Sequence, residues 1–340
     1  MSLSIMLAER GLIPDAMIRS GIRKLLATRE AEETARANAY HDTFVASLAE
    51  APVALDTQAA NEQHYEVPAA FFEQVLGPHL KYSCCHYTNE SDSLADAEAA
   101  MLKLTCERAG LQDGMRILEL GCGWGSLTRW MARQYPETQI HAVSNSATQR
   151  KYIEARCAEE GLGRVTVETC DMNHFNTEKH YDRVVSVEMF EHMRNYPQLF
   201  RRICQWLNPD GKLFLHIFCH KTYTYPFEVE GDDNWMGRYF FTGGMMPAYD
   251  LPGSFKEDLH VAERWQVNGI HYYKTCQDWL ENMDAHKEAL MPIFSTAYGE
   301  QDAKIWFQRW RIFFMSCAEL FRYQQGNTWF VGHYLMQPEK

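Results

Sequence analysis

The 340-residue sequence lacks any apolar run long enough to cross a membrane, since a spanning helix needs about 20 predominantly apolar residues. It also lacks the compact apolar core and cleavage site of a secretory signal peptide. Positive charge is scarce, because 33 Lys and Arg stand against 45 Asp and Glu and give a net charge of −12. This balance disfavours nucleic acid, whose binding needs many phosphate-neutralising cations, and it mildly disfavours an anionic membrane. We therefore expect a cytoplasmic protein without a nucleic-acid partner or integral membrane association.

The spacing of Cys and His residues also indicates neither a disulfide framework nor a metal site. The 10 cysteines are scattered, and only Cys84 and Cys85 are adjacent, which is typical of reduced thiols in a chain of this size. His216, Cys219 and His220 fall in one apolar run, but no second pair of ligands accompanies them, so we expect no metal. What the sequence does have is 46% hydrophobic and 13% aromatic residues, enough for a large core and an enzyme pocket.

Alternating helix and strand patterns dominate the middle of the chain. Residues 1–60 have helical spacing and form a predicted N-terminal extension. The core, 61–220, carries five predicted strands at 115–120, 139–143, 165–168, 181–187 and 212–218. A helix is predicted at 94–109, before the first strand, and a turn at 208–211, before the last. This alternation predicts an α/β fold with a mostly parallel sheet covered on both faces. Residues 221–340 mix aromatic-rich loops with amphipathic helices, predicted at 277–286 and 303–321, and are expected to form a substrate cap and the last part of the sheet.

A glycine-rich turn follows the first predicted strand. Glu119-Leu120-Gly121-Cys122-Gly123-Trp124-Gly125 lies between strand and helix, where glycine lets the backbone turn tightly and approach a ligand. The dinucleotide fingerprint is G-x-G-x-x-G, whereas here the third glycine comes one position early. The acid-x-G-x-G-x-G form is typical of class I methyltransferases, which bind S-adenosylmethionine. A purely structural turn is the alternative.

Two later positions suit the same nucleoside. Asn145 stands about 20 residues beyond the turn, where an acid commonly binds the ribose hydroxyls, and an amide can also hydrogen-bond a hydroxyl. Asp171 and Met172 follow the third predicted strand, where an acid can accept a hydrogen bond from the adenine amino group and an apolar neighbour can pack on the ring. The alternative for Asp171 is an ordinary loop or helix-capping acid.

Glu188, Glu191 and His192 follow the fourth predicted strand, at the edge where open α/β sheets bind ligands. Two carboxylates and an imidazole beside an apolar strand are costly to bury unless they are paired or used. A helix cap or surface turn would explain one such residue, and three favour catalysis. Methyl transfer to an amine requires an unprotonated nitrogen, and a carboxylate–His pair can take the proton.

Several stretches together resemble the cyclopropane fatty acid synthase and mycolic acid methyltransferase superfamily. These are Tyr82-Ser83-Cys84-Cys85, 118–126 and 189–193. Within that superfamily, 218–221, 238–244 and 318–321 look closer to the coclaurine-type (benzylisoquinoline alkaloid) N-methyltransferases of plants. The resemblance runs from about His64 to the C-terminus. It implies a class I, Rossmann-like fold with a seven-stranded sheet, S-adenosylmethionine as the cofactor (S-adenosylhomocysteine as the product), a small-molecule amine acceptor and a homodimer.

The resemblance also implies roles for individual residues. Cofactor contacts are expected from Tyr65, Tyr82, Ser83, Glu119, Gly121, Gly123, Asn145, Gln149, Asp171 and Met172. The catalytic acid and base are expected at Glu191 and His192, with Glu188 nearby. Substrate contacts are expected from Cys84, His216, Tyr272 and Trp329, although Trp329 could equally belong to the core.

A lipid-modifying activity is the alternative function. In the lipid synthases a bicarbonate ion removes the proton after methyl addition to an alkene, and its ligands there would correspond to Cys84, Glu191, His216 and Tyr272. The N-methyltransferases largely keep these residue types too, so their presence does not decide the substrate. Basic residues among 19–29 leave lipid binding by the N-terminal helix open.

The sequence allows two further interpretations, one of Cys317 and one of the chain as a whole. Cys317 falls near a cysteine proposed as a nucleophile in the lipid family, but a small core thiol on a helix is the plainer interpretation. A catalytically silent cofactor-binding module is disfavoured because Glu188, Glu191 and His192 are all intact.

Overall fold

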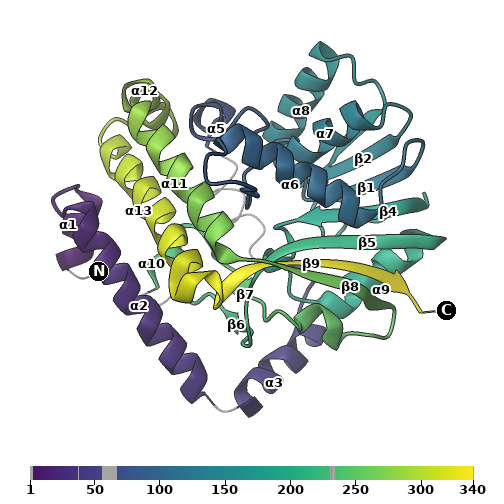
Figure 1. Cartoon of the computed structure of the whole chain (residues 1–340), viewed down its shortest axis with the longest axis horizontal. Helices are drawn as coiled ribbons and strands as arrows, with labels where there is room; N and C mark the ends of the chain where they lie inside the picture. The colour runs from purple at the N-terminus through teal and green to yellow at the C-terminus, as the bar shows by residue number, and fades with distance from the viewer. Residues whose placement is uncertain (1–2, 37, 56–66, 230, 232–233, 340) are drawn as a thin grey trace.

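A seven-stranded sheet forms the centre of the molecule (Figure 1). The computed structural model describes residues 3–36, 38–55, 67–229, 231 and 234–339. The strands follow the order β3-β2-β1-β4-β5-β9-β8. Their bounds are β1 Arg116–Leu120, β2 Gln139–Ser144, β3 Val165–Thr169, β4 Tyr181–Val187, β5 Leu207–His220, β8 Leu259–Val267 and β9 Trp329–Pro338. Strands β1 to β5 are parallel and β9 is antiparallel to both its neighbours, so the predicted α/β fold with a mostly parallel sheet is confirmed.

Helices pack on both faces of the sheet, as strand–helix alternation predicts. Ile117 and Val185 are buried in a cluster with three helices on one face, whereas Leu118 and Val184 are buried in a second cluster, which includes another helix, on the other. These helices are α6 Leu94–Ala109, α7 Ser126–Gln134 and α8 Ala147–Glu159 on the first face, and α9 Tyr196–Trp206 on the second. The period of two along each strand therefore divides the apolar side chains between two core layers.

Helix α6 has clear local signals at both ends. Ser93 and Asp96 form a capping box at its start, which satisfies two backbone N–H groups that the helix leaves unpaired. Gly110 ends it with φ +63°, a conformation that glycine adopts at little cost. These signals place Arg108 in the last turn of the helix.

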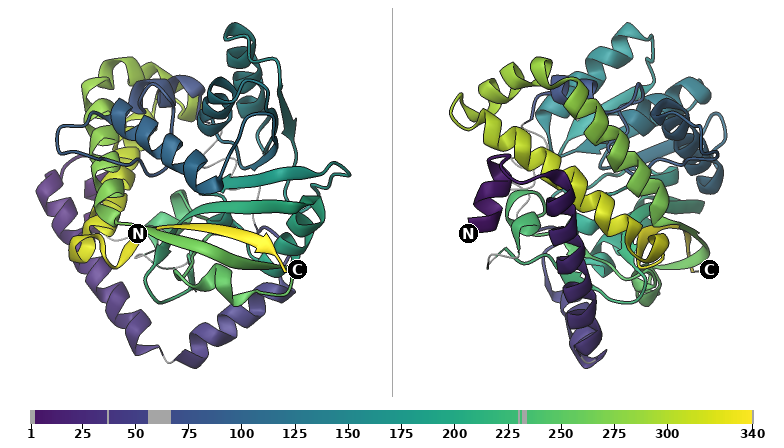
Figure 2. Two further views of the ribbon diagram at one scale, coloured as in Figure 1. Left: turned by 45° about the vertical axis from the view of Figure 1, so that its right-hand side comes forward. Right: turned by 60° about the vertical axis from the view of Figure 1, so that its left-hand side comes forward.

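A second group of helices covers the carboxyl edge of the parallel strands. The group consists of α1 Leu3–Glu9, α2 Asp15–Ala35, α3 Asn38–Ser47, α5 Ala69–Val75, α11 Gly269–Ala285, α12 Lys287–Tyr298 and α13 Ala303–Arg322. Helix α13 packs against α11, α12 and α2, and Figure 2 shows α2 crossing it. The segments between β5 and β8 add α10 Trp235–Tyr239, β6 Tyr225–Pro226 and β7 Met245–Met246. The described residues also form short 3-10 helices at η1 Leu48–Glu50, η2 Phe190–His192, η3 Leu251–Ser254 and η4 Tyr323–Gly326.

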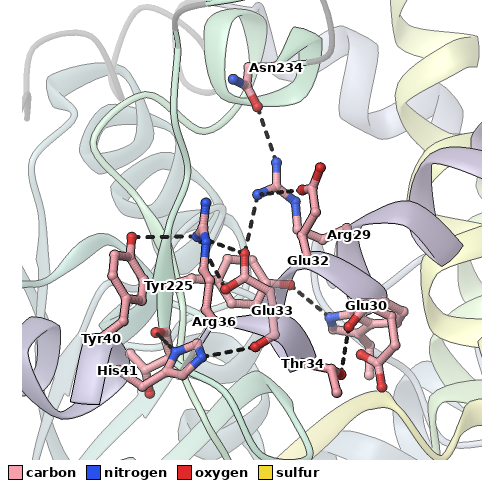
Figure 3. Close-up of polar contacts among 12 residues, drawn as sticks. Arg29, Glu30, Glu32, Glu33, Thr34, Arg36, Tyr40, His41, Tyr225 and Asn234 are labelled. Atoms are coloured by element: carbon pink, nitrogen blue, oxygen red, sulfur yellow. Dashed lines mark hydrogen bonds and ion pairs between the residues drawn. The ribbon is translucent and has the colours of Figure 1, made fainter. Parts of the chain in front are cut away.

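Polar contacts hold the carboxyl half of α2 against the rest of the molecule (Figure 3). The Glu33 carboxylate is buried and accepts hydrogen bonds from Arg29 and Arg36. His41 contacts the backbone oxygens of Glu33 and Thr224 with its two ring nitrogens. The Arg29 and Arg36 pairs offset the cost of burying the Glu33 carboxylate within its own segment. The contacts of His41 with Thr224, and of Glu30 with His220 and Lys221, tie the end of α2 to the end of β5 and the chain that follows it.

Two elements begin earlier than the sequence predicts. Strand β5 begins at Leu207 rather than 212, because the expected turn at 208–211 is a register irregularity opposite Tyr181 and Arg183. Helix α11 begins at Gly269 rather than 277. Strands β8 and β9 had no individual prediction. Among the described residues, no helix combines the length and apolarity that a membrane span requires.

Candidate active site

A cavity of about 870 Å³ lies where the carboxyl ends of β1 and β4 meet the covering helices. One end is lined by the glycine turn and the start of α7, and the opposite end by α1, α2 and α10. Helices α11 and α13 contribute Tyr272, Ile312, Phe313, Cys317 and Phe321 to its walls. Crevices at this edge of parallel sheets are where α/β proteins bind ligands.

The glycine turn 121–125 needs glycine for two physical reasons. Gly121 has φ +80° and a Cβ there would lie 2.7 Å from Met189 Cβ, so a side chain would clash. Gly125 has φ +77° and a Cβ there would lie 2.7 Å from Ile153. Gly123, with φ +52°, has open space where its Cβ would be and lines the cavity. The backbone therefore presents a bare, concave surface to a ligand.

Three buried polar atoms at this end have no hydrogen-bond partner among the described residues. They are Gln149 Nε2, Trp124 Nε1 and Ser126 Oγ, and all three residues line the cavity. Gln149 is held in place because its Oε1 accepts from Ser144 Oγ at 2.6 Å. Since buried donors in native proteins are almost always paired, this end fits a polar ligand such as a nucleoside with an amino-acid tail.

Glu119 supplies a carboxyl group to the same end. It is buried, lines the cavity and accepts a hydrogen bond from Thr128 Oγ1. Burial raises the pKa of Glu119 to about 8, and the Thr128 hydrogen bond opposes that shift. A cation beside it would favour the ionised form.

The structure brings together six of the predicted cofactor residues but not all of them. Tyr82, Ser83, Glu119, Gly121, Gly123 and Gln149 line the cavity. Asn145, Asp171 and Met172 follow β2 and β3 at the same edge but do not line it. Met172 is buried in the core on the α9 face, and Asp171 Oδ1 accepts from the Asn173 N–H at 2.7 Å, as a loop acid does. Tyr65 lies outside the described residues.

Of the two carboxylates expected near the reaction, Glu188 and Glu191, Glu188 lines the cavity. It directly follows β4 with φ +48°, which a non-glycine residue adopts at a cost of about 1–3 kcal/mol. Its Oε1 accepts from the Cys84 N–H at 3.0 Å and contacts His216 Nε2 at 3.1 Å, and its Oε2 accepts from the Tyr272 hydroxyl at 2.6 Å. Burial raises the pKa of Glu188, while Lys81 and the Cys84 and Tyr272 hydrogen bonds oppose that shift.

Glu191 and His192 are separated by the structure, contrary to the expected pair. The Glu191 side chain does not line the cavity, and its Oε1 accepts from the Phe218 N–H at 2.7 Å. Its Oε2 is buried without a hydrogen-bond partner among the described residues, and burial together with Glu188 raises the pKa of Glu191 well above its usual value. His192 lines the cavity and stacks on Phe241 with ring centroids 5.7 Å apart. Burial lowers the pKa of His192 to about 4, and Glu188 opposes this shift, so Glu188 rather than Glu191 is the carboxylate that shares the cavity with His192.

The four expected substrate residues divide between the cavity wall and its support. Tyr272 and Trp329 line the cavity, and Trp329 Nε1 also donates to the Tyr225 hydroxyl at 3.0 Å, so it is both wall and core. Cys84 and His216 are fully buried behind the wall and reach the cavity only through Glu188. Cys317 lines the cavity from α13.

The sequence pattern does not indicate that α2 contributes to the site. Ile18, Gly21 and Ile22 line the cavity, and their helical spacing predicted an apolar face without indicating what that face covers. The pattern does not indicate Lys81 either. It is buried beside the cavity and its Nζ donates to Ser83 Oγ, and a single lysine in a loop carries no sequence signal of this role.

Comparison with known proteins identifies the family. The family model for mycolic acid cyclopropane synthetase matches residues 55–331. The chain belongs to this family. The family and the fold identify the chain as an S-adenosylmethionine-dependent methyltransferase.

Individual family members place the chain more closely. It is 36% identical to (S)-coclaurine N-methyltransferase of Thalictrum flavum subsp. glaucum, over 97% of this chain and 93% of that protein. It is 33% identical to the cyclopropane-fatty-acyl-phospholipid synthase of Escherichia coli K12, over 79% of this chain and 66% of that protein. The crystal structure of coclaurine N-methyltransferase bound to N-methylheliamine and SAH superposes with a TM-score of 0.94 over 98% of both chains, at 35% identity. Mycolic acid cyclopropane synthase CmaA1, at 22% identity and a TM-score of 0.71 over 84% of this chain and 99% of that chain, shares the fold.

Proposed function

We propose that this methyltransferase transfers the methyl group of S-adenosylmethionine to the nitrogen of a small aromatic or alkaloid-like amine. The observation that supports this proposal is the position of the Glu188 carboxylate. The resemblance to lipid synthases assigns bicarbonate contacts to Cys84, His216 and Tyr272, and here these three residues contact the carboxylate of Glu188 instead. The fourth expected ligand, Glu191, is turned to the Phe218 N–H. The chain thus supplies its own anion where the alternative reaction would need a bound one.

A fixed carboxylate in an aromatic cavity favours a cationic substrate. Glu188 and His192 lie among the rings of Phe218, Phe241 and Phe321, all of which line the cavity. A carboxylate attracts an ammonium group strongly where water is scarce, and aromatic faces attract cations as well. A small aromatic amine suits both features, and (S)-coclaurine N-methyltransferase is among the chain's relatives.

The cofactor and the amine would bind in different parts of the cavity. Bound at the glycine-turn end, S-adenosylmethionine would supply an electrophilic methyl group, with Gln149, Trp124 and Ser126 offering their unpaired polar atoms to it. The amine arrives as an ammonium ion and must lose one proton before its lone pair can attack. His192 is unprotonated near pH 7, so its ring is free to take that proton. Burial lowers the pKa of His192 and weakens it as a base, whereas Glu188 opposes this shift and stabilises the imidazolium that forms. Glu191 keeps the backbone beneath them in place through Phe218.

A labelled-methyl screen tests the proposed acceptor class. The enzyme is offered S-adenosylmethionine with a methyl label, a panel of secondary and tertiary aromatic amines, and vesicles of unsaturated phospholipid, and the products are weighed by mass spectrometry. We expect N-methylated amine and unlabelled lipid. Label in the acyl chains, with none in any amine, would favour the cyclopropane alternative and overturn the proposal.

A further inference from the structure

A line of four side chains runs from the cavity, between the sheet and α6, to Arg108 in the last turn of α6. Glu188 contacts His216 Nε2 at 3.1 Å, and His216 Nδ1 lies 2.9 Å from His333 Nε2. His333 Nδ1 in turn lies 2.8 Å from Arg108 Nη1. Both imidazoles are fully buried, whereas Arg108 is only partly buried in the last turn of α6. The line thus joins the proposed catalytic carboxylate to a cation near the surface.

The sheet register explains why these side chains meet. His216 in β5 is the cross-strand partner of His333 in β9, so the two side chains project from the same face and their ring centroids lie 4.7 Å apart. That face carries Phe214 and is covered by α6, which brings Arg108 over the outer imidazole. The Arg108 guanidinium also lies 5.0 Å from the centre of the Trp265 ring in β8, and this contact limits where it can move.

The direction of every hydrogen bond in this line follows from Arg108. A guanidinium can only donate, so His333 Nδ1 must accept. Burial holds the pKa of His333 and of His216 well below the usual value, so each ring is neutral and carries one N–H. His333 therefore carries its proton on Nε2 and donates to His216 Nδ1. His216 then carries its proton on Nε2 and donates to Glu188 Oε1.

We propose that Arg108 is a positioning residue that holds Glu188 in the ionised, acceptor state by fixing the tautomers of His333 and His216. Without a donor at His333 Nδ1, both imidazoles can exchange tautomers together. His216 would then turn a bare Nε2 toward Glu188, and only a protonated Glu188 could donate to it. The inference rests on the proposed function in one respect, namely that Glu188 must be ionised for amine methylation.

Other charged or titratable groups also act on this line, and they stay constant in the test. Those facing Glu188 are Lys81, Cys84, Cys85, Glu191, His192, Tyr272 and Cys276. Lys81 and His86 face the imidazoles beside Arg108. None of them reaches His333 Nδ1 through a described hydrogen bond, so Arg108→Met changes the one donor at that atom.

The test combines a direct view of the tautomers with a pH profile. Long-range ¹H–¹⁵N spectra of the full-length protein labelled at histidine distinguish the two neutral tautomers, with His216→Gln and His333→Gln used for assignment. In the wild type we expect both rings as Nε2–H tautomers. Arg108→Met should give mixed tautomers. The acid limb of the kcat profile, where kcat rises with pH, should move toward higher pH by about one unit. The affinity for S-adenosylhomocysteine should stay the same. Arg108→Lys, which keeps a donor, should restore part of both effects.

Lys103→Met is the matched control, because Lys103 is an exposed cation on the same helix. It should change neither readout. Wild-type rings in the Nδ1–H form, or tautomers and an acid limb that are unchanged in Arg108→Met, would overturn the inference. If the tautomers follow Arg108 but Glu188→Gln keeps full turnover, the line exists and the proposed role of Glu188 in the reaction is wrong.

Discussion

At the scale of single residues, one backbone angle distinguishes the positions of two neighbouring carboxylates. Glu188 and Glu191 are three positions apart, and the sequence pattern alone does not tell which one faces the cavity. The positive φ of Glu188 and the 3-10 turn η2 that follows it turn Glu188 and His192 toward the cavity and Glu191 toward Phe218. The sequence therefore predicts the cluster and its edge of the sheet, and the structure shows that Glu188 shares the cavity with His192. Which carboxylate acts with His192 stays a prediction.

Substitutions at the two carboxylates separate these roles. Glu188→Gln and His192→Ala should each lower kcat by about 10²-fold or more, because proton transfer by a positioned group contributes that much. Glu191→Gln should keep kcat within about threefold, because the amide still accepts from the Phe218 N–H and replaces a carboxyl group whose pKa is well above its usual value. Turnover with saturating amine and binding of S-adenosylhomocysteine measure the difference. A larger loss in Glu191→Gln than in Glu188→Gln would contradict the assignment.

The pH profile of kcat/KM should report Glu188 on its acid side. Burial raises the pKa of Glu188 and lowers that of His192 to about 4. Both groups must be unprotonated for turnover, so the acidic side of the profile follows the higher of the two pKa values, that of Glu188. The rate should therefore rise as the pH passes through the pKa of Glu188. The alkaline limb should follow the pKa of the acceptor amine when that amine is varied, an ionisation that an alkene lacks. An acid limb that persists unchanged in Glu188→Gln would show that another group titrates.

Glu119 should make the protein less stable as the pH rises. Its folded pKa of about 8 lies above the ordinary value of 4.5, so the folded state keeps a proton that the unfolded state releases between these values. The resulting stabilisation is complete below about pH 4.5 and is lost as the pH rises through about 8. Between pH 6 and pH 9, the wild type should lose on the order of 2–4 kcal/mol more unfolding free energy than Glu119→Gln does. Urea unfolding at the two pH values measures this loss, and the exposed Glu137→Gln is the control, which should behave like the wild type. An equal loss in Glu119→Gln and Glu137→Gln would refute the explanation.

At the scale of elements, the predictable parts are those with strong local signals. The capping box of α6 and the continuous branched runs of β1 and β4 place these elements within a residue or two of the predicted bounds. Strand β9 is buried along most of its length and so lacks the alternation that marks a half-buried strand. The function of α2 as a cavity wall depends on contacts with α13 that lie almost 300 residues away in the chain, and local sequence carries no trace of them.

Helix α2 should control the acceptor end of the cavity without affecting the cofactor end. Gly21 lines the cavity, and a Cβ there would meet no atom within 4 Å. Gly21→Phe should fill this space and raise the KM for the amine at least tenfold, with unchanged affinity for S-adenosylhomocysteine. Gly21→Ala is the matched control and should stabilise the helix by about 0.5–1 kcal/mol with little change in KM. Loss of S-adenosylhomocysteine affinity in Gly21→Phe, with a normal KM for the amine, would show that the two ends are assigned the wrong way round.

At the scale of the whole molecule, the sheet order gathers the site from distant parts of the chain. Strand order places β1 beside β4, so the glycine turn at 121–125 and Glu188 share one edge although more than 60 residues separate them. Helices from both ends of the chain then close the cavity above that edge. The alternating pattern and the glycine turn were enough to predict the sheet and its ligand edge, whereas the closure needed the structure. The division of the chain at residues 60 and 220 and the homodimer stay predictions.

A crystal structure of the enzyme with S-adenosylhomocysteine and an accepted amine would show directly whether the cofactor and the amine meet between the glycine turn and Glu188. We expect the nucleoside along Gly121–Ser126, with polar contacts to Gln149. We expect the amine nitrogen between the sulfur of the nucleoside and the pair Glu188 and His192. A nitrogen bound beyond reach of both side chains, or a nucleoside away from the glycine turn, would contradict this arrangement.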